Sequence, residues 1–387
     1  MRVIFFSPVC PWPPDEGGKM RIMGLLGELV KYHEVTLLTV VHKAGDREGV
    51  ERLREKGYRV QAAHVPTGRW RKLWRIFVSY LSFTPYVAVT YRRRDLRRAL
   101  KDLARDQDVA HAEYPYGAQL ISELTCLKVM GTQNVEADVL LGNARRSSNP
   151  LKKLHHLLQS RFMRVFELRT AARMDAVLAC SDADRKFFLS ANARTHTVPN
   201  AVESVHEREF PAGRDVVFTG LMSYLANSEG IRWFCREVWP LVKARAPDAR
   251  LWIVGKEPGS EVVDLAGPDV IVTGRVEDVS GYYRRARVFV CPLRVGSGTR
   301  FKILEAFSWG VAVVSTALGC SGLDTEAGEH LLVAESAADF AAAVLAVLKD
   351  ESLARRLGQS GRELVSRRFT WEATVKILNE KVYQPCA

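Results

Sequence analysis

The chain of 387 residues has 47% hydrophobic residues and a formal net charge of +12, a composition typical of a folded globular protein with about two or three domains. No apolar run is long enough to cross a membrane, and the first residues, MRVIFFSPV, lack the apolar core of a signal peptide. The seven cysteines show no metal-site spacing, so we expect buried free thiols in a reducing, cytoplasmic setting.

The positive charge is concentrated in two segments. Residues 66–105 hold 11 Lys and Arg against 2 acidic residues, and residues 145–173 hold 8 against 1. The two segments together carry +16, and the rest of the chain carries −4. Such a concentration predicts an anionic surface or substrate, although solvated helix faces explain it equally well.

Strand-like and helix-like segments alternate along the first half of the chain. Strands are predicted at 3–9, 34–41, 58–65, 109–114, 126–134, 175–181 and 195–202. Helices are predicted at 20–32, 51–56, 91–106 and 151–173. Asp182 and Asp184 follow a strand that ends at Ser181, and we expect this acidic pair to cap a helix after Ser181, in preference to binding a metal.

The alternation starts again after residue 215. Strands are predicted at 215–220, 250–255, 269–276, 311–316 and 330–334, helices at 228–247 and 300–310 and through most of the remaining chain, and a segment at 282–293 that runs from helix into strand. Repeated βα units predict parallel sheets covered by helices on both faces, in two doubly wound α/β domains. The polar stretch VESVHEREFPAGRD (202–215) is the predicted boundary, so the domains are expected at 1–205 and 206–370.

A glycine-rich loop lies between the strand that ends near Leu293 and the helix predicted at 300–310. Its sequence, GSGTRFKILEAF, places two cations, Arg300 and Lys302, at the start of the helix, and Glu305 one turn further along. Backbone N–H groups of such a loop, a helix N-terminus and two cations favour an anion, and Glu305 suits sugar hydroxyls. Diphosphate with ribose is the ligand that these groups fit. The loop is neither a P-loop nor a GxGxxG fingerprint, because Phe301 stands where the last glycine would be.

The stretch GSGTRFKILEAFSWGVAVVSTALGCSGL resembles the sugar-nucleotide motif of family 4 retaining glycosyltransferases, in the branch that reads G-x-G-T-R-x-K-x-L-E-A and assembles polysaccharides or glycolipids. PPDEGGKMRIMGLLGELVKYHEVTLLT, DVAHAEY, TQNVEAD, LACSDADRKFF, HTVPNAVE and VVFTGLMSYLANSEGIRWF resemble further segments of that family in the same order. The resemblance covers nearly the whole chain. It implies a GT-B fold, in which two Rossmann-like domains face each other across a cleft. The first would bind the acceptor and the second the nucleotide-sugar, and a C-terminal helix at 371–387 would pack back on the first.

The resemblance also implies roles for individual residues. Glu305 would hold the ribose, and the glycine loop with Arg300 and Lys302 would contact the diphosphate. His111 and Glu113 stand where the family has its H-x-H pattern, which makes them candidates for the catalytic pocket together with Arg300 and Lys302. The expected substrate-binding residues are Gly17, Gly18, Asn134, Arg275, Val276, Gly296, Ser297, Gly298, Thr299 and Glu305.

The sequence departs from the family pattern at two points of the second domain. Ser297 replaces the first Glu of the E-x7-E motif, and no basic pair follows the first strand of the second domain, where the chain reads GLMSYL. Arg300 and Lys302 are expected to supply the missing charge. The implied reaction transfers a sugar from a UDP- or GDP-type donor to a glycan, lipid-linked or small-molecule acceptor, with retention at the anomeric carbon. We expect it to need neither a metal nor a cofactor.

The segment RWRKLWRIFVSY (69–80) interleaves cations and tryptophans with apolar residues, as segments at membrane surfaces do. The hypothesis is peripheral binding to the inner face of a membrane. Two other classes stay open from the residues alone. Basic helices with aromatic residues suit a nucleic-acid-binding protein, but no helix-turn-helix, RRM or zinc pattern is found, so we expect no nucleic-acid partner. An NAD-dependent dehydrogenase is disfavoured because the GxGxxG pattern is missing.

Overall fold

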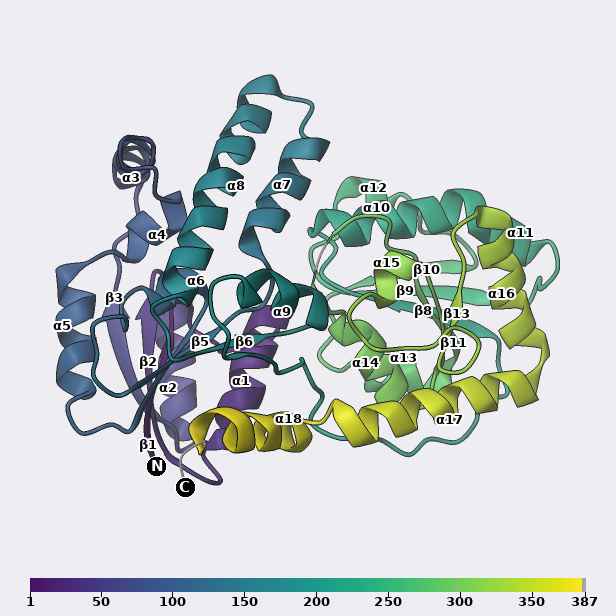
Figure 1. Ribbon diagram of the computed structural model, residues 1–387. Helices are drawn as coiled ribbons and strands as arrows, with labels where there is room; N and C mark the ends of the chain where they lie inside the picture. The colour runs from purple at the N-terminus through teal and green to yellow at the C-terminus, as the bar shows by residue number, and fades with distance from the viewer. Residues whose placement is uncertain (297, 385–387) are drawn as a thin grey trace. The chain divides into compact units, whose positions relative to one another are not determined.

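The computed structural model describes residues 1–296 and 298–384, which form two compact units. Unit 1 consists of residues 1–200 together with the segment that begins at Thr374, and unit 2 consists of Ala201–Ala373. The division lies at Asn200 and Ala201, where 205 and 206 were expected, and α18 (Trp371–Leu378) carries the chain back into unit 1. Figure 1 labels the helices and strands.

Unit 1 is built around a parallel sheet in the order β3-β2-β1-β4-β5-β6-β7. Its central strands are buried on both faces, as the run RVIFFS in β1 shows, because helices cover both sides. The strands are β1 (Arg2–Ser7), β2 (Glu34–Val41), β3 (Arg59–His64), β4 (Val109–Glu113), β5 (Leu127–Gly131), β6 (Ala176–Ala179) and β7 (Thr195–Thr197).

The helices of unit 1 lie around this sheet, and α7 and α8 project from it side by side (Figure 1). They are α1 (Gly17–Leu29), α2 (Ala44–Glu55), α3 (Arg69–Ser82), α4 (Tyr86–Tyr91), α5 (Arg94–Leu103), α6 (Pro115–Ala118), α7 (Glu136–Arg146), α8 (Pro150–Ala171) and α9 (Asp182–Leu189), followed after α18 by a π-helical turn, η2 (Asn379–Tyr383). A helix begins after Ser181 as predicted, but the Ser181 side chain caps it by accepting from the Asp184 N–H, and Asp182 and Asp184 lie in its first turn.

Unit 2 has its own parallel sheet, in the order β10-β9-β8-β11-β12-β13. Its strands are β8 (Asp215–Thr219), β9 (Arg250–Val254), β10 (Val270–Gly274), β11 (Ala286–Cys291), β12 (Ala312–Ser315) and β13 (Leu332–Val333). Its helices are α10 (Leu225–Trp233), a π-helical turn η1 (Phe234–Val238), α11 (Trp239–Lys243), α12 (Ser260–Val263), α13 (Ser280–Arg285), α14 (Phe301–Ser308), α15 (Ala317–Cys320), α16 (Ala337–Lys349) and α17 (Glu351–Arg368).

In each sheet the strand order changes direction at one position, between two neighbouring strands. We call the carboxyl edge of the sheet at this position its point of divergence. In unit 1 the chain runs outward from β1 to β2 and β3 on one side, and continues from β4 on the other side. In unit 2 the same divergence lies between β8 and β11. The loops that leave two such neighbouring strands turn to opposite faces of the sheet, and the space left between them is where open α/β sheets bind ligands.

Two features of the sequence bear on the surface of the units. Six cysteines are free thiols in the described residues: those at 10, 180 and 291 are buried as expected, and those at 126, 235 and 320 are only half-buried. Cys386 lies outside the described residues. Among the residues that the structure describes, no helix has both the length and the apolar content required to cross a membrane.

Candidate functional site

The glycine loop of unit 2 leaves β11 at the point of divergence and leads into α14. Gly296 and Gly298 have φ values of 111° and 82°, which side chains other than glycine rarely adopt. A Cβ at Gly296 would lie 3.2 Å from the Tyr224 hydroxyl and 3.3 Å from Arg300 Nη2, so the loop passes close to the start of α10. Gly298 and Thr299 are partly exposed, and Ser297 lies outside the described residues.

The two predicted cations lie at this point of divergence. Arg300 is the N-cap residue of α14 and is only 7% exposed. The Lys302 ammonium donates to Asn227 Oδ1 at 2.7 Å and lies 4.2 Å from the centre of the Phe218 ring. Loss of water around the ammonium, together with the charge of Arg300, lowers the pKa of Lys302 to about 8. Neither cation points freely into bulk solvent.

Lys302 lies beside the loop in which the sequence lacks a basic pair. A Cβ on Gly220, the first residue after β8, would lie 2.7 Å from both Lys302 Nζ and Asn227 Nδ2. Asn227 Nδ2 in turn donates to the Leu221 carbonyl at 2.7 Å. A cation of α14, Lys302, therefore lies beside the loop after β8, where the basic pair of the family pattern is missing.

Glu305 follows Lys302 by about one turn of α14 and remains partly exposed. The Tyr283 hydroxyl lies 3.0 Å from Glu305 Oε2 and 3.0 Å from Thr219 Oγ1, at the end of β8. Burial raises the pKa of Glu305, while the bond from Tyr283 and the charge of Lys302 act in the opposite direction. The carboxylate is thus held in a fixed orientation, as a group that accepts hydrogen bonds from hydroxyls should be.

Arg275 and Val276 lie further along the same edge of the sheet. They follow Gly274, whose φ of 67° ends β10, and the Gly274 carbonyl accepts from Gly255 N–H at 3.2 Å. Arg275 is exposed and Val276 partly exposed. Two strands separate β10 from β11, so these residues share the edge of the sheet with the glycine loop without adjoining it.

At the corresponding point of divergence in unit 1, His111 and Glu113 are fully buried. Glu113 lies in an ion pair with Arg21 of α1 at 3.6 Å, and His111 Nε2 lies 3.3 Å from Glu113 Oε1. The other ring nitrogen of His111 lies 2.7 Å from the Tyr383 hydroxyl, near the end of the chain. Burial acts to raise the pKa of Glu113, but Arg21, His111 and Gln133 together lower it. Because the His111 and Glu113 side chains are not exposed, this geometry does not support their direct contact with a substrate.

The accessible residues of unit 1 lie around the start of α1. Gly17 is exposed, and Gly18 and Asn134 are partly exposed. The Gln133 side chain donates to the Gly18 carbonyl at 3.1 Å and lies 3.4 Å from Glu113 Oε2, so it joins the buried pair to the helix terminus. A Cβ on Gly18 would collide with the Tyr114 hydroxyl and with Gln133 Oε1, which explains the glycine.

Four residues that the sequence analysis did not name complete the two sites: Arg21, Asn227, Tyr283 and Tyr383. Only Arg21 carries a signal that could have been read. It falls on the same face of α1 as Ile22, Leu25 and Leu29, and a cation on an apolar face requires a buried partner. Asn227, Tyr283 and Tyr383 come from distant segments and meet their partners only in the folded chain.

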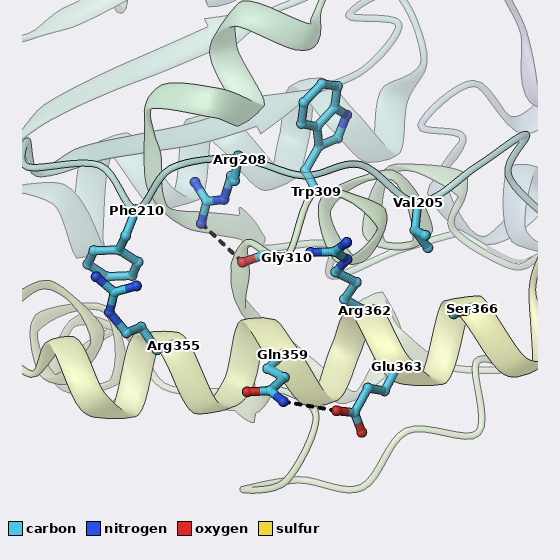
Figure 2. A pocket seen from close by; sticks show the side chains of 10 residues that line it. All are labelled: Val205, Arg208, Phe210, Trp309, Gly310, Arg355, Gln359, Arg362, Glu363 and Ser366. Carbon is cyan, nitrogen blue, oxygen red and sulfur yellow. Dashed lines mark hydrogen bonds between the residues drawn. The ribbon is translucent and has the colours of Figure 1, made fainter.

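Unit 2 also contains an open groove of about 500 Å³ along α17 (Figure 2). Its polar side chains are used within the protein. Arg208 donates to the carbonyls of Ala286 at 2.6 Å and Gly310 at 3.0 Å, and Arg355 stacks 4.0 Å from the centre of the Phe210 ring. None of the predicted site residues lines this groove. The linker that begins unit 2 lines one side of the groove, and α17 lines the other (Figure 2).

No group of three or more His, Cys, Asp or Glu side chains within the described part of the chain is arranged to hold a metal ion. Each point of divergence gathers cations, amides and hydroxyls around one carboxylate, which is Glu113 in unit 1 and Glu305 in unit 2. Such an arrangement in unit 2 suits a ligand with an anionic part and a hydroxyl-bearing part.

Comparison with known proteins agrees with this geometry. Residues 213–350, which contain both loops of the unit 2 site, match a family model described as Glycosyl transferases group 1. An uncharacterized 44.6 kDa protein in the cps region of Klebsiella pneumoniae is 23% identical, with 91% of this chain and 92% of that protein covered.

Two solved structures show the same fold over their whole length. A mutant of Staphylococcus aureus TarM, in complex with fondaparinux, α-GlcNAc-glycerol and UDP, gives a TM-score of 0.72 at 12% identity, covering 99% of this chain and 100% of that one. The lipopolysaccharide outer core galactosyltransferase WaaB gives 0.65 at 13% identity, covering both chains in full, at 100%. The two parallel-sheet units are those of the GT-B fold. Unit 2 thus contains a Glycosyl transferases group 1 domain, and this domain makes the protein a glycosyltransferase enzyme.

Proposed function

We propose that the protein is a retaining glycosyltransferase that takes a nucleoside-diphosphate sugar of the UDP or GDP type and glycosylates a glycan or lipid-linked acceptor, in the assembly of a polysaccharide or glycolipid. The observation that carries the proposal is the position of Lys302, whose ammonium lies between the loops after β8 and β11 with Arg300 beside it. The relative from a cps region and the UDP in the TarM structure support the same assignment.

The leaving group of this reaction is a nucleoside diphosphate, which gains negative charge as the bond to the sugar breaks. Cations that are already in place where this charge develops lower the barrier more than mobile ones do. Lys302 is fixed by Asn227 and Phe218, and Arg300 is held at the start of α14. We propose that these two side chains and the N–H groups of the Gly296–Arg300 loop bind the diphosphate without a metal, and that Glu305 accepts from the ribose hydroxyls.

We assign the buried residues of unit 1 a positioning role. Contacts run from Arg21 to Glu113 and from Glu113 to Gln133, and Gln133 holds the backbone at Gly18. His111 links the Glu113 carboxylate to the Tyr383 hydroxyl. Gly17, Gly18 and Asn134 would then be the groups of unit 1 that meet a substrate. Arg275 and Val276 would lie beside the nucleotide base.

Calorimetric titration with UDP, GDP and ADP, followed by a screen of sugar release from their nucleotide-sugars, tests the proposal. We expect one nucleoside diphosphate to bind with micromolar affinity, and an added chelator to leave both binding and turnover unchanged. NMR of the first-formed product should show the anomeric configuration of the donor. Binding of none of the nucleotides would overturn the donor assignment, and activity that is lost with chelator and restored by Mg²⁺ or Mn²⁺ would overturn metal independence.

A further inference from the structure

Helix α3 of unit 1 exposes its apolar face to solvent. Trp70 is 82% exposed, Trp74 65% and Leu81 73%, and Leu73 and Phe77 are exposed as well. At about 100° per residue these five side chains fall within roughly 100° of the helix circumference. They form one stripe along the 14 residues of α3, and the Trp74 and Phe77 rings already lie 5.6 Å apart. Surface helices of globular proteins normally bury such a stripe.

The helix is attached to unit 1 through its opposite side, by hydrogen bonds and by the Tyr80 ring against Phe162 of α8. Ser79, the buried residue of α3, lies about 180° from Trp70 around the axis. Its hydroxyl donates to the Thr84 carbonyl at 2.6 Å and accepts from Gln159 of α8 at 2.9 Å. Arg75 donates to the Pro66 carbonyl at 2.9 Å. These fixed contacts keep the apolar stripe turned away from the body of unit 1.

Cations border the stripe and no acidic residue lies near it in sequence. Residues 56–94 contain nine Lys and Arg and neither Asp nor Glu, and Arg69, Arg71 and Lys72 lie on exposed positions of α3 itself. Helix α8 repeats the pattern where it meets α3. Its His155 Nδ1 lies 2.6 Å from the Tyr80 hydroxyl, and within a turn before His155 come exposed Leu151 and Leu154 with Lys152 and Lys153 between them.

We propose that α3 and the start of α8 form a docking surface for an anionic lipid bilayer. An apolar stripe bordered by Lys and Arg, with Trp on it, matches the interface between lipid chains and anionic headgroups. A second copy of this chain fits less well, because a symmetric contact through α3 would bring like charges together. This surface goes beyond the proposed reaction, since binding to lipid needs neither donor nor acceptor, and it would bring unit 1 to lipid-linked acceptors.

Vesicle sedimentation tests the surface with the full chain. Vesicles of phosphatidylcholine alone are compared with vesicles in which about a third of the lipid is phosphatidylglycerol, at about 0.05 M and about 0.5 M salt. We expect binding to the anionic vesicles at low salt that is at least about ten-fold stronger than binding to the neutral ones, and largely lost at high salt. Equal binding to both vesicle types, or none to either, would overturn the proposal.

Two variants and a control locate the binding. W70S/W74S removes both tryptophans of the stripe, and R69Q/R71Q removes the two exposed charges that lie on either side of Trp70 around the helix. Each is expected to weaken vesicle binding about ten-fold or more. The control L241S/V263S replaces exposed apolar residues of unit 2 and should bind as the parent does. Circular dichroism and thermal unfolding show that each variant is folded. If the protein forms dimers in solution, loses them in W70S/W74S and does not bind vesicles, then the stripe is a contact between two copies and the bilayer proposal is rejected.

Discussion

Lys302 is the residue on which the proposed donor site depends most directly. Its ammonium lies between two loops at a point of divergence of the sheet, fixed by Asn227 and by the face of the Phe218 ring. We predict that Lys302→Met weakens binding of the nucleoside diphosphate by about 10- to 100-fold, as expected for a lost charge-assisted hydrogen bond in a partly buried site. Calorimetric titration measures the change.

The matched control for this variant is Lys349→Met, which removes an exposed ammonium at the end of α16. It should leave the affinity within about two-fold of the parent. Equal losses in the two variants would show that net charge, and no particular position, governs nucleotide binding.

The pKa of Lys302 also predicts how donor binding depends on pH. The value of about 8 means that the free site loses its ammonium as the pH rises through 8, while a bound diphosphate favours the charged form. Affinity should therefore fall above pH 8, and binding at pH 9 should take up a proton. Titration in two buffers with different ionisation enthalpies measures that uptake. The Lys302→Met variant should lose this uptake, and its persistence there would assign it to another group.

At the scale of single elements, Glu167 of α8 holds the start of α7. Its carboxylate accepts from the N–H groups of Glu136 at 2.7 Å and Ala137 at 3.2 Å, and its side chain is fully buried. Burial raises the pKa of Glu167 to about 8 and that of Glu136 to about 7. In the unfolded chain both titrate near ~4.3. Between these values the folded protein binds more protons than the unfolded one, so the stability from these groups is complete below pH ~4.3 and is lost as the pH rises through 7 to 8.

The free energy of unfolding should therefore decrease between pH 5 and pH 8, and Glu167→Gln should make that dependence shallower. Denaturant titrations at several pH values measure the slope. Glu167→Ala leaves two N–H groups of α7 without their partner and should lower stability by about 1–3 kcal/mol at pH 6. An unchanged slope in Glu167→Gln would exclude Glu167 as the titrating group.

A second prediction at this scale concerns the packing of α17 in unit 2. A Cβ on Gly358 would collide with the backbone carbonyl of Gly310 and lie 3.6 Å from Ala312 N. Backbone cannot move aside as a side chain can, so Gly358→Ala should push α17 away from the turn before β12 and lower stability by about 1–3 kcal/mol. Gly213→Ala, which has open space around its Cβ, is the control. Thermal unfolding of the two variants compares them, and equal melting temperatures would contradict the close approach.

Most strands could be predicted because each one is a short apolar run bounded by turn residues. The strand at 34–41 has the predicted bounds, and β1, β8, β9 and β11 lie inside or close to the predicted segments, since buried parallel strands read as apolar runs. Several helical segments differ. α3, α4 and α7 (EADVLLGNARR) were not predicted, and only residues 94–103 of the helix expected at 91–106 form α5, because the backbone at Arg93 is extended. The helix expected at 228–247 passes through η1 before Pro240, which has no N–H to continue the regular pattern.

The candidate site was predictable where one loop carries it and not where distant segments meet. Gly296, Arg300, Lys302 and Glu305 lie within ten residues, and the ligand that we propose for them rests on their residue types and spacing. The burial of Glu113 could not be foreseen, because its partner Arg21 lies in another helix and Tyr383 near the far end of the chain. Sequence spacing does not record which side chains meet in the interior.

At the scale of the whole molecule, unit 1 is completed by the end of the chain. Leu378 and Val382 are fully buried in the structure, and Tyr383 bonds to His111. Removal of the segment from Thr374 onward should therefore destabilise unit 1, by several kcal/mol for the lost apolar burial alone, and leave unit 2 folded. Hydrogen exchange measured by mass spectrometry should show faster exchange in β4 and α1, and unchanged exchange in β8 and β11. Uniform exchange across both units would contradict this division.

The same topology makes unit 2 an insertion within unit 1. Val202 N–H donates to the Phe369 carbonyl at 2.8 Å, so the two ends of unit 2 leave it side by side. On the unit 1 side, the Thr374 hydroxyl lies 3.5 Å from the Pro199 carbonyl, so the two ends of the gap also adjoin. Each unit is thus a closed module with neighbouring ends. Unit 2 of one such enzyme can therefore be exchanged for that of another by two cuts at these paired junctions, and neither core needs a new chain path.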